Sequence, residues 1–230
     1  MDVIIFIALL ILFLGIGYRA STITTYDSTD YLVAGRSISP LLTALSASAS
    51  KYSGYMFVGL VGYIYHYGLS SVWILLGFLF GDALAFYTLH QKVREESERI
   101  KATTFIGLIS RWHHNDYTVL RLLLGLIALI FLMTYAAAQF SAGSKTLYAA
   151  FNWHHHAGAT ICAILIIAYC LKGGLRASIW TDAAQAIIMF IALTILLTSI
   201  VNASQGIGSF IHSLQQVSPS YLNLGTERFG

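Results

Sequence analysis

A single lysine lies in the middle of an apolar stretch that is long enough to cross a membrane. The stretch runs from Pro40 to Tyr65, and Lys51 is its only charged residue. A charged side chain at the centre of a bilayer costs about 3 kcal/mol or more, so such a residue usually faces a water-filled cavity or a partner. We therefore interpret this stretch as a helix that lines a binding site, rather than as a simple anchor.

Small and hydroxyl-bearing residues surround this lysine: Ser46, Ser48, Ser50, Ser53 and Gly54. They would weaken a water-exposed helix, whereas in a membrane they permit close helix packing and an unwound turn beside a site. Unwinding removes the intrahelical partners of backbone carbonyls, which can then coordinate an ion. The sequence predicts a break or kink near residues 48–54.

The overall composition is that of a membrane protein. Hydrophobic residues make up 57% of the 230 residues and charged residues only 10%, whereas a soluble domain carries about 25% charged residues. The sequence contains no P-loop, dinucleotide fingerprint, paired Cys-x-x-Cys or nucleophile elbow. It contains no nucleophile–base or metal constellation either, so we expect no enzyme, no bound cofactor and no nucleic-acid partner.

Six apolar stretches approach or exceed the length of about 20 residues that a bilayer demands. They are Val3–Tyr18, Leu41–Tyr65, Leu69–His90, Val119–Ala138, Ala157–Leu171 and Ala177–Val201. The first is interpreted as a retained span, because no basic residue precedes it as in a signal peptide. Residues 202–230 are predicted to form a polar extracytoplasmic segment. The sequence thus predicts an all-α membrane protein with six transmembrane helices within residues 1–201.

The basic residues indicate the orientation of these spans. The loops between spans one and two, three and four, and five and six hold Arg19, Arg36, Lys92, Arg94, Arg99, Lys101, Arg111, Arg121, Lys172 and Arg176. The opposite side holds only Lys145 and Arg228. Because cytoplasmic loops are enriched in Lys and Arg, we predict an extracytoplasmic N-terminus in a multi-pass protein of the cell (inner) membrane.

The loop between spans three and four has two open interpretations. Residues 91–111 mix charges with an apolar face that includes Phe105 and Ile109, which suits a short interfacial helix on the cytoplasmic surface. A solvated connector fits the same pattern. On the opposite side, the adjacent histidines 154–156 lack the spacing of a structural metal site, so we assign no metal to them.

Three local patterns carry a resemblance to a known family. YLVAGRS occupies residues 31–37, ALSASAS-x-x-SGY occupies residues 44–55, and GGLRASIWTDAAQ occupies residues 173–185. Their order and spacing resemble those of the sodium/solute symporter family, and most closely its sodium/proline symporter branch. The resemblance covers the chain from about Asp27 to Ser199.

This resemblance implies a fold. Members of the family resemble LeuT, which has two inverted five-helix repeats, with an extra helix in front of them. By that analogy, residues 3–18 form the extra helix and the next five spans form the first repeat. The second repeat is absent from these 230 residues. The chain is therefore expected to be the front part of a longer protein or a truncated product.

The resemblance also implies positions for ion and solute binding. In the family, backbone carbonyls at the positions of Ala49 and Tyr52 help to bind sodium. Ser53 and Gly54 match positions that shape the sodium and substrate sites, and Tyr135 matches a tyrosine near the substrate cavity. The hydroxyl ligands of the sodium ion come from the second repeat of the family.

Two charged residues match positions that act in coupling or gating. Arg36 matches an arginine that is important for transport near the cytoplasmic opening, and its alternative role is that of a positive-inside anchor. Asp182 matches a functionally important aspartate just inside the sixth span. Its alternative role is to cap the start of that helix together with Thr181, where a carboxylate is favoured.

Lys51 departs from the family pattern, because sodium/proline symporters carry an aspartate at this place. A fixed ammonium repels a sodium ion and can stand in for one, so the coupling ion stays open between sodium and a proton. A lysine can also snorkel to the interface, but Lys51 lies about 15 Å from the inner end of its span. We therefore count Lys51 among the ion-binding residues.

Asp82 is a second departure, because it is the only acid in the third span. Spans two and three run antiparallel through the turn at residues 66–68, and Asp82 lies about 12 Å from the cytoplasmic end. Lys51 and Asp82 are thus at similar depth, and pairing would lower the cost of burying either charge. We hypothesise that the two side chains pair, and we count Asp82 among the residues that act in coupling or gating.

These observations favour the N-terminal part of a cation-coupled secondary transporter for a small organic solute such as an amino acid. The alternative is a symporter-like membrane sensor module of a histidine kinase, since a replaced sodium-site acid suits reduced transport. The expected partners are the lipid bilayer, the solute, and either the second half of the protein or a kinase domain. The sequence that follows Gly230 in the reading frame would separate the two functions.

Overall fold

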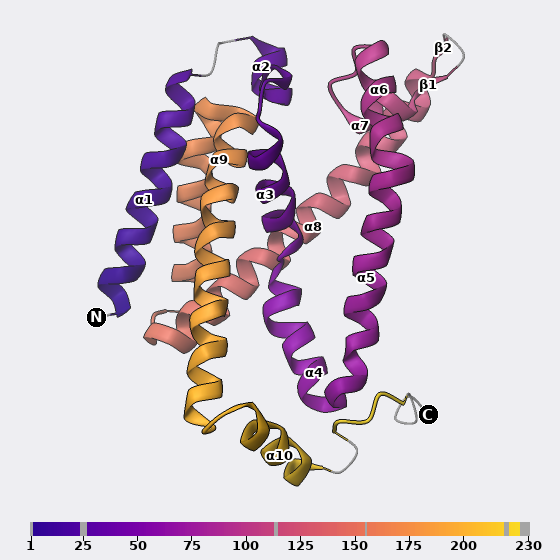
Figure 1. The fold of residues 1–230 in the computed structure, drawn as a ribbon. Coiled ribbons are helices and arrows are strands. Elements are labelled where there is room, and N and C mark those ends of the chain that lie inside the picture. Colours follow the sequence, from indigo (N-terminus) through magenta and orange to yellow (C-terminus); the bar gives the residue numbers. More distant parts are fainter. Residues whose placement is uncertain (1, 24–26, 113–114, 155, 219–220, 226–230) are drawn as a thin grey trace. The chain divides into compact units, whose positions relative to one another are not determined.

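The computed structural model describes residues 2–23, 27–112, 115–154, 156–218 and 221–225. These residues are helical almost throughout (Figure 1). The exception is a small antiparallel hairpin in which β1 (Arg111–Trp112) pairs with β2 (Asn115–Asp116). Apart from this hairpin, the predicted all-α class is confirmed for the described residues.

The chain forms two compact units. The first combines residues up to Gly54 with Glu96–Ile187, and the second combines Tyr55–Glu95 with the residues from Ile188 onward. The helices of the first unit are α1 (Asp2–Ile23), α2 (Ser28–Val33), the 3-10 turn η1 (Ala34–Arg36), α3 (Pro40–Lys51), α7 (Phe105–Ile109), α8 (Thr118–Phe151) and most of α9 (Ala157–Ala203).

In the first unit, α1, α3 and α9 lie side by side (Figure 1). A Cβ atom on Gly17 of α1 would lie 2.6 Å from the Cβ atom of Tyr169 and 3.4 Å from the Cγ2 atom of Thr181, both in α9. The Thr181 side chain is fully buried. Small residues therefore let α1 approach α9 closely, which is how membrane helices gain packing energy without a hydrophobic driving force.

Two helices extend beyond the spans predicted for them, while the bounds of the membrane spans stay a prediction. α1 continues beyond Tyr18 to Ile23, because its last turn packs against α9 at Gly173. α8 continues beyond Ala138 to Phe151. The polar residues that follow Ala138 remain helical because they find partners on neighbouring segments of the first unit, as shown below.

Predicted spans five and six are the two arms of α9. The chain reverses at Gly174, which has φ 53° and ψ −144°, and the Gly-Gly pair was predicted to lie between these spans. A positive φ favours glycine. A side chain would also not fit, since a Cβ atom on Gly174 would lie 2.5 Å from the carbonyl oxygen of Tyr31.

The second unit contains a similar reversal. Its elements are the π-helical η2 (Tyr55–Leu60), α4 (Val61–Tyr67), the 3-10 turn η3 (Gly68–Ser71), α5 (Val72–Ala85), the π-helical η4 (Phe86–His90), the start of α6 (Gln91–Arg99), the end of α9 and α10 (Ile207–Val217). α4 and α5 run in opposite directions from Gly68 (Figure 1), which has φ 66° and ψ −143°. The predicted tight turn at residues 66–68 is confirmed.

Four helices in the described part of the chain are long and apolar enough to cross a membrane. They are Asp2–Ile23, Tyr55–Arg99, Thr118–Phe151 and Ala157–Ala203. Two of them contain the reversals at Gly68 and Gly174, so four is the number of helices and not of membrane crossings. The six crossings predicted from the sequence stay a prediction.

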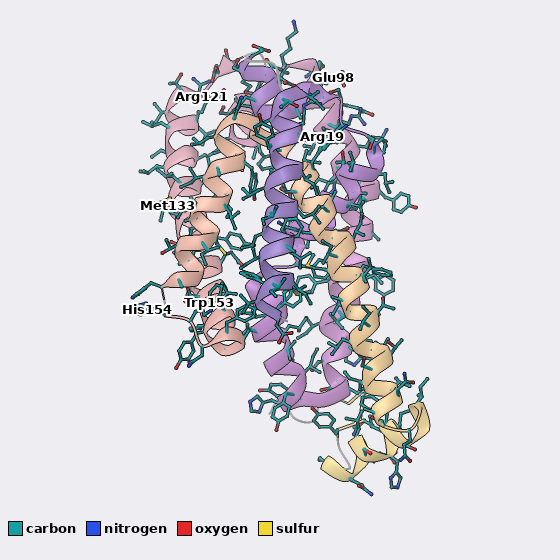
Figure 2. All side chains as sticks on the ribbon, turned by 90° about the vertical axis from the view of Figure 1, so that its left-hand side faces the viewer. Arg19, Glu98, Arg121, Met133, Trp153 and His154 are labelled. Atoms are coloured by element: carbon teal, nitrogen blue, oxygen red, sulfur yellow. The ribbon has the colours of Figure 1, made fainter. Side chains whose placement is uncertain are left out.

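The basic loops of the first unit gather at one end. Figure 2 shows Arg19, Glu98 and Arg121 at one end and Trp153 and His154 toward the other. This arrangement agrees with the charge count that suggested the orientation, although the orientation in a membrane stays a prediction. Arg228, one of the two basic residues assigned to the opposite side, lies outside the described residues.

Candidate functional site

The helix that carries Lys51 is broken. α3 ends at Lys51, Tyr52 and Ser53 are not helical, and helical structure resumes at Gly54. The Tyr52 N–H donates to the carbonyl of Ala49 at 3.0 Å, and the Ser53 N–H donates to the carbonyl of Lys51 at 3.0 Å. The predicted interruption near residues 48–54 is confirmed.

Serine side chains weaken α3 just before this break. The Ser48 hydroxyl donates to the carbonyl of Ala44 at 2.9 Å, and the Ser50 hydroxyl donates to the carbonyl of Ser46 at 2.9 Å. Such bonds compete with the backbone ladder and destabilise or bend a helix slightly. The local sequence therefore explains why the helix ends here.

The far side of the break is held by α8. The Gly54 N–H, which lacks an intrahelical acceptor at a helix start, donates to the Oε1 atom of Gln139 at 2.7 Å. A Cβ atom on Gly54 would lie 2.6 Å from the Cβ atom of Ala142. Glycine at this position thus allows the broken helix to contact α8 directly.

Sequence reasoning missed Gln139. A signal was available, because Gln139 is the only carboxamide between Arg121 and Lys145 in a helix that is otherwise largely apolar. A second polar residue of this region, Ser144, also has a partner, since its hydroxyl accepts the N–H of Ala159 at 2.8 Å. These contacts explain why α8 extends past the predicted end.

Tyr135 lies one helical turn before Gln139. Residues four apart in a helix share a face, so Tyr135 belongs to the face of α8 that contacts Gly54. Its side chain is 50% exposed, and that of Tyr52 is 47% exposed. The structure thus brings the helix of Tyr135 to the break, while a binding role for either tyrosine stays a prediction.

Asp182 connects α9 to α3. Its Oδ2 atom accepts the Ser46 hydroxyl at 2.9 Å and the Ser178 hydroxyl at 3.5 Å. The alternative role as a helix cap is wrong, because this arm of α9 starts at Gly174, more than two turns earlier. The Thr181 hydroxyl also caps nothing, since it donates back to the carbonyl of Ala177 at 3.0 Å.

Arg36 contacts the end of α6 and the connector between α6 and α7. Its Nη2 atom donates to the carbonyl of Ser97 at 3.1 Å and to the carbonyl of Ala102 at 3.1 Å. The residue is exposed and hydrogen-bonded, and both its gating role and its alternative role as a positive-inside anchor stay predictions. Whether it acts in transport stays a prediction.

Asp30 and Arg176 form an ion pair that sequence reasoning did not anticipate. The Arg176 Nη2 atom lies 2.6 Å from the Asp30 Oδ1 atom, and the two side chains are 13% and 9% exposed. Arg176 also donates to the carbonyl of Ala34 at 3.0 Å. A signal was available, because one residue directly precedes the YLVAGRS pattern and the other lies within GGLR.

The hypothesised Lys51–Asp82 pair stays a prediction. Lys51 belongs to the first unit, and Asp82 lies in α5 of the second. Among the described residues, no group of three His, Cys, Asp or Glu side chains could hold a metal ion. One of the three adjacent histidines, His155, lies outside the described residues.

Known proteins match most of this chain. The sequence profile of the sodium:solute symporter family matches residues 31–228. Sodium/proline symporters of Staphylococcus aureus strains JH9, JH1 and USA300 are each 33% identical to it over 210 residues. The matched part covers 91% of this chain and 41% of each relative, so the chain spans about two fifths of their length. No solved structure matches the chain.

The apolar helices and these matches agree with each other. The protein is a multi-pass membrane protein, and its family points to a transporter rather than an enzyme. The profile match includes all three of the patterns that suggested the resemblance, at residues 31–37, 44–55 and 173–185. The chain belongs to the sodium:solute symporter family.

Proposed function

We propose that this chain is the N-terminal part of a secondary transporter that moves a small organic solute together with a cation. The observation that carries the proposal is the break at Tyr52–Ser53, whose two sides contact α9 and α8. A broken membrane helix presents carbonyls and half-helix ends to an ion and a solute. The relatives are named sodium/proline symporters, so an amino acid is the first solute to test.

Two backbone carbonyls support a sodium site at this break, whereas the charge of Lys51 opposes it. The proposed ligands are the carbonyls of Ala49 and Tyr52, and a carbonyl that accepts one hydrogen bond retains a second lone pair. Lys51 lies between these two residues in the chain, and its ammonium opposes a nearby cation. We infer that Lys51 takes the place of a cation here, which makes a proton the alternative coupling ion.

Asp182 is the proposed coupling carboxylate. An ionised carboxylate accepts about four hydrogen bonds, and two hydroxyl donors contact this one. Carboxylates within a membrane commonly mark ion or proton pathways. Ser53, Gly54 and Tyr135 are the proposed solute-facing residues of the same unit, and Arg36 is the proposed gating residue.

The proposed architecture is an extra helix followed by the first repeat of a LeuT-like fold. The two reversals and the broken helix support six crossings. The gathering of basic loops at one end of the first unit supports an extracytoplasmic N-terminus in the inner membrane. A second repeat, outside these 230 residues, would supply the remaining ligands and the other half of the cavity.

Uptake measurements test this function. We expect the product of the complete reading frame, reconstituted in proteoliposomes, to accumulate proline or another amino acid when an ion gradient is imposed. We expect Lys51→Asp to increase the dependence on sodium, because it removes the ammonium. The 230-residue chain alone should not accumulate solute, since it spans only about two fifths of the length of its relatives. Concentrative uptake by the chain alone would contradict the proposal, as would uptake by the complete protein that no ion gradient affects.

Lys51 also favours a second candidate, a sensor module of a histidine kinase, because loss of the family aspartate suits reduced transport. The reading frame beyond residue 230 distinguishes the two. A further set of membrane spans supports the transporter, whereas a histidine-kinase core supports the sensor.

A further inference from the structure

The turn between α2 and α3 has an unusual backbone. Ala34, Gly35 and Arg36 have φ values of 51°, 57° and 54°, so three consecutive residues are left-handed. L-residues normally adopt this conformation singly, because Cβ then crowds the following carbonyl. Strained backbone of this kind persists only when the surrounding structure holds it, and it is found mainly at sites that bind, switch or clamp.

On one side, this turn is held by α9. The Ala34 carbonyl accepts a hydrogen bond from Arg176 at 3.0 Å, and Arg176 in turn pairs with Asp30 at 2.6 Å. Glycine is favoured between them, since its φ is 57° and a Cβ atom on Gly35 would lie only 3.0 Å from the Asp30 Oδ1 atom. Arg176 of α9 thus contacts both α2, at Asp30, and the turn, at Ala34.

On the other side, the turn contacts the end of α6 and the connector between α6 and α7. Arg36, the last left-handed residue, donates to the carbonyls of Ser97 and Ala102. Its guanidinium reaches both carbonyls from this backbone conformation, so the turn and the connector are placed together. The turn thus lies between the Asp30–Arg176 pair on one side and the contacts of Arg36 on the other.

The same segment closes the reversal of α9. The Tyr31 hydroxyl donates to the carbonyl of Cys170 at 3.2 Å, in the last turn before the reversal. The Tyr31 carbonyl also contacts Gly174. Displacing α2 would remove both contacts, which would loosen the tip of α9 and uncover the residues around Cys170.

We propose that Asp30, Arg36 and Arg176 form a latch that joins α2, the tip of α9 and the α6–α7 connector at the basic end of the first unit. Asp30 and Arg176 are positioning residues, because they act through the turn and through Arg36. The latch rests on contacts within one unit. If the proposed function holds, its opening changes access to the solute pathway from this end.

The two native cysteines report on the latch. Cys170 lies in the turn that Tyr31 closes, and Cys162 lies further from the tip in the same arm of α9. The 230-residue chain in phospholipid nanodiscs is treated with a maleimide, and mass spectrometry follows both thiols in the same molecule. We expect Asp30→Asn to raise the labelling rate of Cys170 about tenfold or more, since it leaves one member of a buried pair without its charge. Cys162 should change far less.

Three further variants separate charge from general damage. The single variants Asp30→Glu and Arg176→Lys retain both charges of the pair. The labelling rate of Cys170 in each should stay close to that of the unsubstituted protein. Asp116→Asn removes an exposed carboxylate that pairs with Arg121 at 2.9 Å, and it should leave both thiols unchanged. Unchanged Cys170 labelling in Asp30→Asn would overturn the latch. An equal rise at Cys162, or no rescue by either charge-retaining variant, would overturn it too, because the pair would then support the whole unit. Neither measurement depends on transport.

Discussion

The reversals at Gly174 and Gly68 use one backbone conformation in two units of the molecule. Their φ and ψ values are 53° and −144° in the first unit and 66° and −143° in the second. In each case, the carbonyl of a tyrosine from a distant segment occupies the space that a Cβ atom on the glycine would need. The tyrosine is Tyr31 at Gly174 and Tyr221 at Gly68. Glycine is therefore required twice, for its φ value and for the space that it leaves.

At both reversals, the tyrosine hydroxyl also donates a hydrogen bond to a carbonyl near the end of the preceding helix. Tyr31 donates to the carbonyl of Cys170 at 3.2 Å. Tyr221 donates to the carbonyl of Tyr65 at 2.9 Å and lies 3.3 Å from the carbonyl of Ile64. The last carbonyls of a helix have no intrahelical donor, so each tyrosine satisfies an end that the reversal exposes.

The two reversals differ in what else holds the tyrosine segment. In the first unit, the Asp30–Arg176 ion pair lies beside Tyr31 and is nearly buried. In the second, the additional bonds are neutral, from the Leu69 N–H to the Tyr221 carbonyl at 2.8 Å and from the Trp73 indole to the Leu224 carbonyl at 3.0 Å. Neutral bonds contribute about 1 kcal/mol each, whereas breaking a buried pair costs about 3–5 kcal/mol.

This difference suggests unequal stability for the two reversals. Segments that open easily have exposed hydrogen bonds and few buried contacts. By that criterion, the segment around Tyr221 releases the α4–α5 turn more readily than the segment around Tyr31 releases α9. The same backbone conformation thus forms a firmly held reversal at Gly174 and a reversal that opens more readily at Gly68.

Alanine at the two glycines gives the largest expected effect. We expect Gly174→Ala to lower the free energy of unfolding by about 3 kcal/mol, from the left-handed backbone and the overlap with the Tyr31 carbonyl. Gly68→Ala should cost less, about 1–2 kcal/mol, because the segment around Tyr221 can move away. Titration with SDS in mixed micelles measures both. Equal losses would remove the difference between the two reversals.

A double-mutant cycle tests whether Lys51 and Asp82, which belong to different units, stabilise the protein together. If the side chains pair, Lys51→Ala and Asp82→Ala should together cost about 2 kcal/mol less than the sum of the single losses. Lys51→Ala combined with Glu95→Ala is the control, since Glu95 contacts Gln91 within α6. Additive losses in the Lys51–Asp82 cycle would show that the two residues do not pair.

The sequence predicted those features whose cause is local. The break after Lys51 follows from the serines and the glycine around it, and the α9 reversal follows from Gly173-Gly174. The end of α8 was not predictable in this way, because Gln139 finds its partner far away in the chain. The Asp30–Arg176 pair joins residues 146 positions apart; the neighbouring family patterns mark both residues as notable, but they do not indicate that the two charges meet.

Removal of the two tyrosine hydroxyls tests the feature that the reversals share. Tyr31→Phe and Tyr221→Phe each delete a neutral hydrogen bond to a helix end, so we expect a loss of about 1 kcal/mol in each case. The losses should be similar, because the ion pair does not involve the Tyr31 hydroxyl. A much larger loss for Tyr31→Phe would mean that the hydroxyl and the ion pair act as one network.

The smallest expected effect isolates the exposed bond of the second reversal. Trp73→Phe keeps an aromatic ring but deletes the indole donor to the Leu224 carbonyl, so it should cost about 0.5–1 kcal/mol. Hydrogen exchange followed by mass spectrometry should show faster exchange at Leu69, whose N–H bonds to Tyr221, and unchanged exchange around Gly174. Trp180→Phe is the matched control, because it changes an indole in the arm of α9 that follows Gly174. Protection of Leu69 that survives Trp73→Phe would show that the Tyr221 segment stays bound without this bond. The second reversal would then be as firmly held as the first, despite its lack of an ion pair among the contacts described above.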